Sequence, residues 1–382
     1  MTSEETIKET IKETILAEYD SNKALYTTFL MQMGNLMRSL IEFEDVKISS
    51  MDSRIKDKES LSKKIDKKQT DLFKGSKKYK YKYNNLKDLT DICGIRICTF
   101  YSDDVDKIAN IIEKEFTVDT INSIDKRISI EPDKFGYLSL HYIVSLPKNR
   151  LNLTENSSFK NIKFEIQIRS MLQHTWAEIE HDLGYKSAEG LPKEIKRDFS
   201  RLAGLLEIAD KEFLSIRDYL DDYQDKVNKI IQSPLITTEA KDISIDRITL
   251  KELVKSDFFI QQFNFITKET GVLFNYSLTD SDGDSLTTAF DFLNILTIKD
   301  LKQLLEESNL LLIATIKQEY SDPESVNLLD KTVLFYSLYY KILKESMPAE
   351  TFKTIYNILN VSANYKERHS TLLELYNIII SK

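Results

Sequence analysis

Three short segments place polar side chains within otherwise apolar stretches. Their polar members are Asp91 and Arg96, then Tyr137, Ser139 and His141, then Glu165, Gln167 and Arg169. Asp91 and Arg96 stand at the start and in the body of their strand. Alternate residues of a β-strand share a face, so each of the other two sets projects to one side of its strand. Polar groups on strands that look central cost free energy unless they serve a site. An acid on each of two strands suits divalent-metal nucleotide chemistry, in which carboxylates bind Mg²⁺ and the metal binds phosphates.

A lysine-rich segment precedes these motifs. Residues 54–82 hold 12 Lys or Arg against 4 Asp or Glu, a local charge of +8 inside a chain of net charge −8. Such a field can hold polyphosphate or nucleic acid, although a solvated helix and loop is the better account of most of these lysines. Arg54, Lys56 and Lys64 are the members expected to contact phosphates.

Several common sites are absent from the sequence. Neither a P-loop nor a dinucleotide fingerprint occurs, and there is no nucleophile elbow or His-Glu-x-x-His zinc helix. His174 and His181 lie seven residues apart without a nearby Cys or third His, so we interpret them as hydrogen-bonded helix residues.

The elements that must position the polar segments follow from hydrophobic periodicity. Residues 1–44 have helical spacing, and residues 45–231 alternate strand and helix signals before ending in long helices. This pattern predicts an α/β (α+β) domain in which helices flank a mixed sheet. Its strands are expected at 46–55, 92–100, 116–124, 138–146 and 162–168, with a helix at 103–115. Residues 232–242 are typical of a linker, and 243–382 of a second unit, mostly helical after residue 298.

Composition sets outer bounds on the protein class. The chain has 382 residues, 41% hydrophobic and 30% charged, which fits a globular protein of two domains. Two cysteines cannot form a disulfide scaffold. The first 12 residues lack an apolar signal core, and the longest apolar run, 310–316, is too short to span a bilayer. We therefore expect a soluble cytoplasmic protein with no membrane partner.

Four ordered motifs resemble the RelA/SpoT-type (p)ppGpp synthetases, particularly the small alarmone synthetases. The motifs are Arg54-Ile-Lys56-x3-Ser60-x3-Lys64, Asp91-Ile-Cys-Gly-Ile-Arg96, Gly136-Tyr137-Leu-Ser-Leu-His141, and Glu165-Ile-Gln167-Ile-Arg169 followed by Gln173-His174-Thr-Trp176-Ala-Glu178-Ile-Glu180-His181. The resemblance covers about residues 45–220. It implies a fold related to nucleotidyltransferases of the DNA polymerase β type. It also implies transfer of the β,γ-pyrophosphate of ATP to the 3′-hydroxyl of GDP or GTP, with release of AMP.

By matched position, the resemblance assigns the ATP side of the site to five residues. Arg54 and Arg96 would stack on adenine, and Lys56, Ser60 and Lys64 would contact the ATP phosphates. Phosphoryl transfer depends chiefly on alignment and charge neutralisation, so basic residues around two nucleotides agree with that assignment.

The catalytic and acceptor residues follow from the same resemblance. Asp91 would hold Mg²⁺, and Glu165 would act as general base or share the metal. Tyr137 would stack on guanine, with His141 and Gln167 near the acceptor nucleotide.

The acceptor motif departs from the family pattern. Leu138 stands where an arginine is frequent, and Asp133 stands where a lysine is usual, with Lys134 one residue later as a candidate replacement. The sequence therefore leaves the choice between GDP and GTP open. It also leaves open a toxin-type relative that pyrophosphorylates the 3′ end of tRNA, with 243–382 as a fused inhibitor. A non-catalytic nucleotide sensor is a third, less favoured function. The sequence also leaves open whether the chain forms a homo-oligomer.

Overall fold

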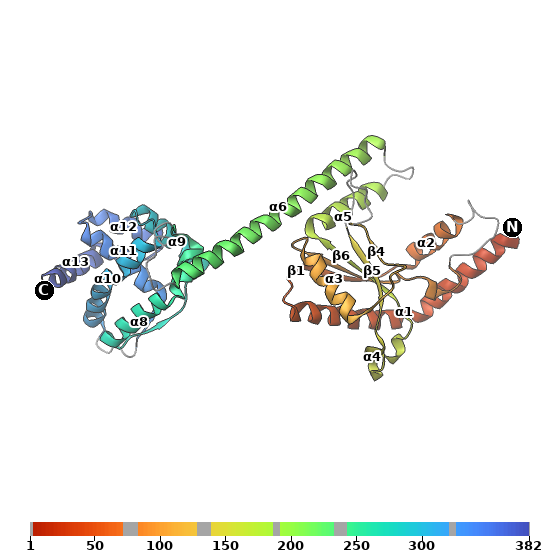
Figure 1. Ribbon diagram of the computed structural model, residues 1–382, viewed down its shortest axis with the longest axis horizontal. Helices are drawn as coiled ribbons and strands as arrows, with labels where there is room; N and C mark the ends of the chain where they lie inside the picture. Colours follow the sequence, from red (N-terminus) through yellow and green to blue (C-terminus); the bar gives the residue numbers. More distant parts are fainter. Residues whose placement is uncertain are drawn as a thin grey trace. The chain divides into compact units, whose positions relative to one another are not determined.

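The computed structural model describes residues 3–71, 83–127, 139–185, 192–232, 243–320 and 326–381. The chain divides into two compact units, Met1–Arg217 and Asp218–Lys382, and each is described by itself (Figure 1). Within the described ranges, no helix has both the length and the apolar character that a membrane span requires.

A mixed sheet forms the centre of the first unit. Its main strands are β1 (Ile48–Ile55), β2 (Cys93–Thr99), β6 (Phe164–Ser170) and β5 (Leu140–Ser145), neighbouring in that order. β2 runs parallel to β6, whereas β1 pairs antiparallel with β2 and β5 antiparallel with β6. The predicted α/β class with a mixed, helix-flanked sheet is therefore confirmed.

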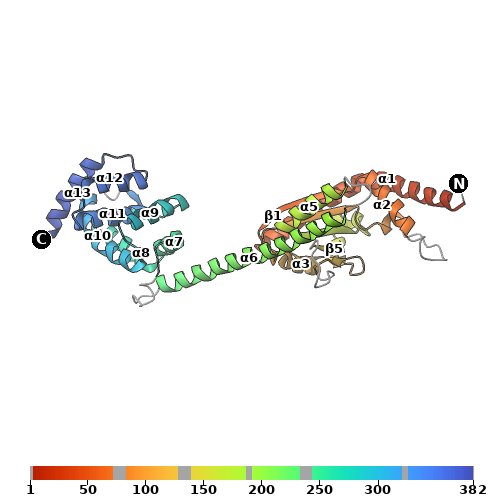
Figure 2. The same cartoon turned by 90° about the horizontal axis from the view of Figure 1, so that it is seen from above.

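Helices cover both faces of this sheet (Figures 1 and 2). On one face, α1 (Ser3–Phe43) contacts β1 and β2, and α3 (Asp104–Glu115) contacts β6. On the other face, α5 (Met171–Tyr185) contacts β2 and β6, and α6 (Lys193–Ile231) packs against α5. The unit also contains α2 (Lys58–Asp71), α4 (Lys148–Leu151) and two 3₁₀ turns, η1 (Leu86–Asp88) and η2 (Thr154–Phe159).

The apolar core lies between the sheet and the α1 and α3 helices. On α1 the buried residues recur every three or four positions, as expected for one helix face. These α1 residues belong to the same buried cluster as alternate residues of the central strands. The cluster includes Ile15, Phe29, Met33, Met37 and Ile41 of α1, and Ile95, Ile97, Ile166 and Ile168 of the sheet. Because these isoleucines point into the core, the intervening polar residues of β2 and β6 face α5.

One predicted strand, 116–124, is wrong as a single element. The chain instead forms β3 (Thr117–Val118) and β4 (Ile124–Asp125), both paired with β5. Between them the Asp119 carboxylate accepts hydrogen bonds from the backbone N–H groups of Ile121 and Asn122. This Asx turn interrupts the strand, because the aspartate offers the backbone a local alternative to the sheet ladder. The predicted helices of residues 1–44 form the single helix α1.

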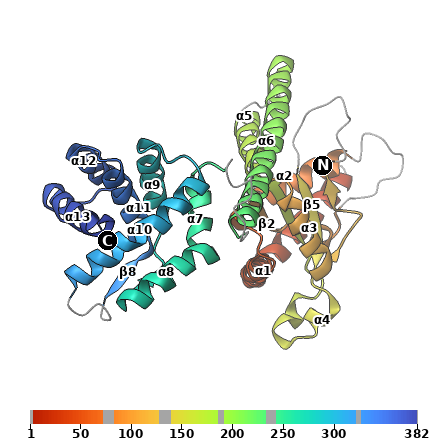
Figure 3. The same ribbon diagram turned by 60° about the vertical axis from the view of Figure 1, so that its left-hand side comes forward.

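The second unit is helical from its start. It contains α7 (Arg247–Val254), α8 (Asp257–Thr270), α9 (Asp280–Phe292), α10 (Ile298–Glu319), α11 (Asp330–Lys344), α12 (Ala349–Ile358) and α13 (Tyr365–Ile380), with a short parallel pair, β7 (Leu273–Asn275) and β8 (Asn327–Leu329). Figure 3 shows α10 among these helices, and it contacts α8, α11 and α13. The prediction of a mostly helical second unit is confirmed, but its helices begin earlier than residue 298, with α7, α8 and α9.

The division between the units also differs from the expected one. It falls at Arg217/Asp218 rather than at the linker expected over 232–242, which lies outside the described residues. The physical reason is that the last turns of α6 belong to the second core, where Val227, Ile230 and Ile231 are buried.

Candidate active site

An aspartate between two lysines marks one part of the site. Lys56 Nζ lies 2.5 Å from Asp91 Oδ2, and Lys64 Nζ lies 2.6 Å from Asp91 Oδ1. The end of β1 is joined to the start of β2 by the backbone hydrogen bond from Lys56 N to Ile92 O, at 2.8 Å. The hydroxyl of Tyr19 on α1 donates a hydrogen bond to the backbone oxygen of Lys56 at 2.7 Å. These contacts hold the lysine beside the aspartate.

The two ammonium groups keep Asp91 ionised. Burial disfavours its charge, but the attraction and hydrogen bonds of Lys56 and Lys64 outweigh burial, so the pKa of Asp91 is below its ordinary 3.8. Burial also lowers the pKa of Lys64, against the opposing effect of Asp91. The cluster carries one excess positive charge and is partly shielded from water, which suits it to a phosphate.

The second carboxylate, Glu165, is held by a chain of donors on adjacent strands. His141 Nδ1 lies 2.8 Å from Glu165 Oε1, and Gln167 Nε2 donates to Glu165 Oε2 at 2.9 Å. Arg169 donates to Gln167 Oε1 at 2.8 Å. Because arginine can only donate, it fixes the Gln167 amide with its nitrogen toward the glutamate. Each carboxylate oxygen of Glu165 therefore has one hydrogen-bond partner and keeps a lone pair for a further ligand or proton.

These donors favour the charged form of Glu165. Burial alone would raise its pKa, but hydrogen bonds from His141 and Gln167 outweigh burial and hold the pKa below 4.5. Asp91 acts in the opposite sense, since its charge lies near enough to oppose ionisation of Glu165. A carboxyl whose pKa is lowered by folding stabilises the folded state above its ordinary pKa, and that stability is lost as the pH falls through the folded value.

Beside Glu165 lies a pocket of about 440 Å³ whose charge is mainly positive. Its lining residues come from β1, β2, β5, β6, α5 and the chain after β4; they are Arg54, Arg96, Lys126, His141, Gln167, Arg169, Trp176, Ala177, Glu178, Glu180 and His181. Arg54 lies opposite Gly94 in the β1–β2 ladder, two residues from Arg96, so the two guanidinium groups share one face. Arg96 Nη1 is 2.8 Å from Glu178 Oε1 on α5.

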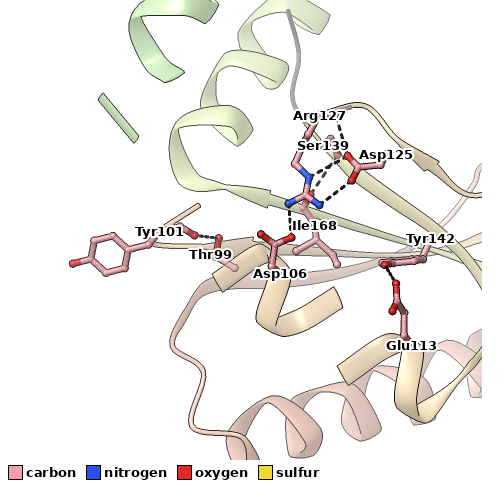
Figure 4. A network of polar contacts seen from close by, with 9 residues as sticks. All are labelled: Thr99, Tyr101, Asp106, Glu113, Asp125, Arg127, Ser139, Tyr142 and Ile168. Atoms are coloured by element: carbon pink, nitrogen blue, oxygen red, sulfur yellow. Dashed lines mark hydrogen bonds and ion pairs between the residues drawn. The ribbon is translucent and has the colours of Figure 1, made fainter. Parts of the chain in front are cut away.

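The residues flanking 128–138 are fixed at the edge of the pocket. Arg127 makes paired contacts with Asp125, at 3.0 Å and 2.8 Å, and a 2.7 Å contact with Asp106 of α3 (Figure 4). Lys126 N donates to Ser139 O at 3.0 Å, which brings the two ends of the segment together. Ser139 is buried and donates to Ile168 O of β6. Lys126, Arg127 and Ser139 are thus held by hydrogen bonds to the elements around the sheet that carries Glu165.

The structure brings together most, not all, of the predicted site residues. The residues that meet at the two carboxylates or line the pocket are Arg54, Lys56, Lys64, Asp91, Arg96, His141, Glu165 and Gln167. Ser60 is exposed in the first turn of α2, where its backbone N–H donates to Asp57 Oδ1 at 2.8 Å, and it does not line the pocket beside Glu165. Tyr137 and Lys134 lie outside the described residues.

Sequence reasoning missed several pocket residues. Lys126 lies in a segment with no recognisable motif, and burial lowers the pKa of its ammonium. Trp176, Glu180 and His181 of α5 also line the pocket, although we had interpreted His181 as a purely structural helix residue. Trp176 and Glu180 are four residues apart in the block after Arg169, and this spacing is the signal that would have placed those two on one helix face.

Asp91 and Glu165 could supply some of the ligands of a magnesium ion, but not a full set of protein ligands. Among the described residues, no group of three or more His, Cys, Asp or Glu side chains is placed to hold a metal by itself. Magnesium is usually held by one or two carboxylates together with substrate phosphates and water. Asp91 and Glu165, both ionised, fit that arrangement.

Two carboxylates on a mixed sheet beside a basic pocket form a site with the side chains that metal ions and phosphates require. Residues 53–190 match the model of the region found in RelA / SpoT proteins. The chain belongs to the RelA/SpoT family. The second compact unit lies beyond the matched residues.

Two relatives that match this chain are named GTP pyrophosphokinases. GTP pyrophosphokinase YjbM of Bacillus subtilis is 30% identical over 193 residues, which cover 49% of this chain and 82% of the relative. GTP pyrophosphokinase YwaC of the same organism is 27% identical, covering 44% and 73% respectively. A GTP pyrophosphokinase family protein from Streptococcus pneumoniae, of known structure, is 26% identical with a TM-score of 0.43, covering 54% of this chain and 96% of that one.

Proposed function

We propose that the chain is a GTP/GDP pyrophosphokinase. In this reaction the acceptor 3′-oxygen bonds to the β-phosphorus of ATP, the bond between that phosphorus and the α–β bridging oxygen breaks, and AMP leaves. The 3′-hydroxyl proton passes to a base. The observation that carries the proposal is the ionised Glu165, hydrogen-bonded to His141 and Gln167 at the wall of a basic pocket. Membership in a family whose matched relatives are GTP pyrophosphokinases supports it.

On the donor side, we assign binding of ATP to the basic residues of β1, β2 and α2. Arg54 and Arg96 share one sheet face, where planar guanidinium groups can stack on adenine. Lys56 and Lys64 are already paired with a carboxylate, so they can exchange Asp91 for phosphate oxygens without loss of an ionic partner. Ser60 would join them only if its exposed side chain turns toward the phosphates.

On the acceptor side, we assign Glu165 as the base for the 3′-hydroxyl. Its lowered pKa keeps it ionised at neutral pH, as a proton acceptor must be. Lys126 and Arg169 supply positive charge in the same pocket, suited to the acceptor's 5′-phosphates. Tyr137 is proposed to stack on guanine and Lys134 to contact the acceptor, on sequence grounds alone.

Asp91 and Glu165 are the residues proposed to hold Mg²⁺. When bound with nucleotide, the ion would neutralise phosphate charge and orient the transferring group. A reaction of ATP with guanosine nucleotides agrees with the cytoplasmic location expected from the sequence.

The acceptor can be tested directly. Purified protein is incubated with γ-labelled ATP and Mg²⁺, and with GDP, GTP or deacylated tRNA in separate reactions, and the products are separated by chromatography. We expect label on a guanosine tetra- or pentaphosphate. Label on tRNA alone would assign the protein to the toxin-type reaction, and nucleotide binding without transfer to either acceptor would indicate a sensor.

Removal of His141 is expected to shift the pH dependence of the reaction. Without its hydrogen bond, burial of Glu165 is less well opposed, so the pKa of that carboxyl rises and the acid limb of kcat/KM moves to higher pH. His141→Ala should also lower kcat by about 10–100-fold through misplacement of the base. A pH–rate profile checks both effects, and an unmoved acid limb would contradict the role of this hydrogen bond.

Lys64 is expected to bind the phosphates of ATP rather than the acceptor nucleotide. Lys64→Met should raise the KM for ATP and lower kcat/KM by about 100-fold, because a point charge on a transferring phosphate is lost. Lys63→Met is the matched control: its exposed side chain pairs with Glu59 one turn away on α2, and such pairs contribute about 0.3–0.5 kcal/mol. Equal effects of the two substitutions on steady-state kinetics would refute the assignment.

A further inference from the structure

Arg96 is joined to α5 by an ion pair inside the pocket beside Glu165. Its Nη1 donates to Glu178 Oε1 at 2.8 Å, and both side chains line the pocket. The side chain of Arg96 is 24% exposed and that of Glu178 is 52% exposed. An ion pair exposed to this degree contributes little to the stability of a fold. Its place in the pocket indicates a role in ligand binding instead.

Negative charge faces the Arg96 guanidinium from two elements. Glu178 approaches it from α5, and Asp52 of β1 is its direct cross-strand neighbour in the antiparallel ladder. Residues directly opposite in such a ladder share a face, with their Cβ atoms about 4.5–5.5 Å apart. The charge of Arg96 is therefore compensated before any ligand binds.

His174 does not take Glu178 away from Arg96 at neutral pH. Its Nδ1 atom is buried and lies 3.8 Å from Glu178 Oε1, beyond hydrogen-bond distance. Burial, followed by the positive charge of Arg169, lowers the pKa of His174 below its ordinary 6.5. The imidazole is thus neutral at neutral pH, and Arg96 remains the charged partner of Glu178.

These contacts suit Arg96 to a base rather than to a phosphate. The bond to Glu178 uses the edge of the guanidinium, so its planar faces remain available for stacking. A compensated guanidinium attracts anions less than the cluster of Lys56, Lys64 and Asp91, which carries one excess positive charge. The two parts of the donor site therefore differ in charge as the two ends of ATP do.

We propose that Glu178 is the positioning residue for the donor base: it holds Arg96 by its edge, so that one face is ready to stack on adenine. The proposal rests on the assignment of ATP to Arg54 and Arg96 in the proposed function, and adds the residue that orders one of these arginines. Immobilising a long side chain during binding reduces affinity. An arginine that is already ordered avoids this loss.

Removal of the carboxylate should weaken binding of ATP and leave the acceptor unaffected. Glu178→Ala is expected to raise the Kd and the KM of ATP by about 3–10-fold, the effect of immobilising one long side chain. Neither kcat at saturating ATP nor the KM of the acceptor should change. Calorimetric titration with ATP and Mg²⁺, without acceptor, measures the Kd. Glu269→Ala is the matched control, because Glu269 is 45% exposed in a pair with Lys317 of the second unit.

Three further measurements separate positioning from a structural role. Glu178→Gln keeps an oxygen that can accept from Arg96, so it should restore most of the ATP affinity. Inorganic triphosphate has no base, so it should bind wild type and Glu178→Ala equally. In an Arg96→Lys protein, which has no planar group to position, the additional change Glu178→Ala should not alter ATP affinity.

The binding data decide the proposal without any turnover. An unchanged ATP affinity in Glu178→Ala would overturn it, as would an equal loss for inorganic triphosphate or a loss that persists in the Arg96→Lys protein. A wild type that binds ATP but transfers nothing to a guanosine nucleotide would refute the pyrophosphokinase function alone, and the affinities would still decide the role of Glu178. A wild type that binds no ATP would refute both.

Discussion

Replacing Glu165 by glutamine is expected to lower kcat by about a thousandfold, within the 10²–10⁴ range typical of a positioned general base. The amide keeps the shape of the side chain but cannot take up the 3′-hydroxyl proton. Because His141 and Gln167 hold the residue from both sides, the pocket should keep its form and nucleotide affinity should change little. Single-turnover transfer rates and equilibrium binding of ATP and GTP measure the two quantities separately.

The matched control for this substitution is Glu155→Gln. Glu155 is exposed on η2 and its replacement should leave the rate unchanged. If Glu165→Gln keeps a rate within about tenfold of wild type, the carboxylate is not the base. If nucleotide affinity falls in parallel with the rate, its role is in binding instead.

Replacing Asp91 by asparagine is expected to have an effect of similar size for a different reason. The substitution removes the charge between Lys56 and Lys64 and leaves two ammonium groups close together without their common partner. It also removes one of the two oxygen donors proposed for Mg²⁺. We expect kcat to fall by about a thousandfold and the Mg²⁺ concentration for half-maximal rate to rise, since one carboxylate remains.

The control for Asp91 lies on α2. Asp66 pairs with Lys12 at 2.8 Å on the surface, and Asp66→Asn should change neither rate nor metal dependence. A variant of Asp91 that keeps the wild-type Mg²⁺ dependence would contradict its assignment as a ligand. A near-normal rate would exclude it from the catalytic machinery.

Much of this site could be predicted because strand geometry links sequence spacing to position. Alternation along β6 places Glu165, Gln167 and Arg169 on one face, and the paired register with β5 adds His141. The sequence alone could also indicate that Asp91 opens a buried strand. It could not indicate that two lysines flank the aspartate, because that contact depends on the backbone bond between the end of β1 and the start of β2.

The errors have local physical causes. The strand predicted at 116–124 ignored the side chain of Asp119, which caps a turn in its middle. The early helices of the second unit were missed although each has a capping residue. Asp246, Ser256 and Thr279 accept hydrogen bonds from the backbone N–H three residues later, at Thr249, Phe259 and Asp282. Lys126 could not be predicted, because its position depends on the pairing of β4 with β5.

The most direct test of the central claim is a stoichiometric product analysis. Wild type, Asp91→Asn and Glu165→Gln proteins are incubated with ATP, Mg²⁺ and GTP or GDP, and AMP and guanosine product are measured together by ³¹P NMR and mass spectrometry. The account predicts one AMP for each guanosine nucleotide that gains a 3′-diphosphate, and almost none from either variant. Release of ADP or phosphate without a 3′-modified guanosine nucleotide would contradict it.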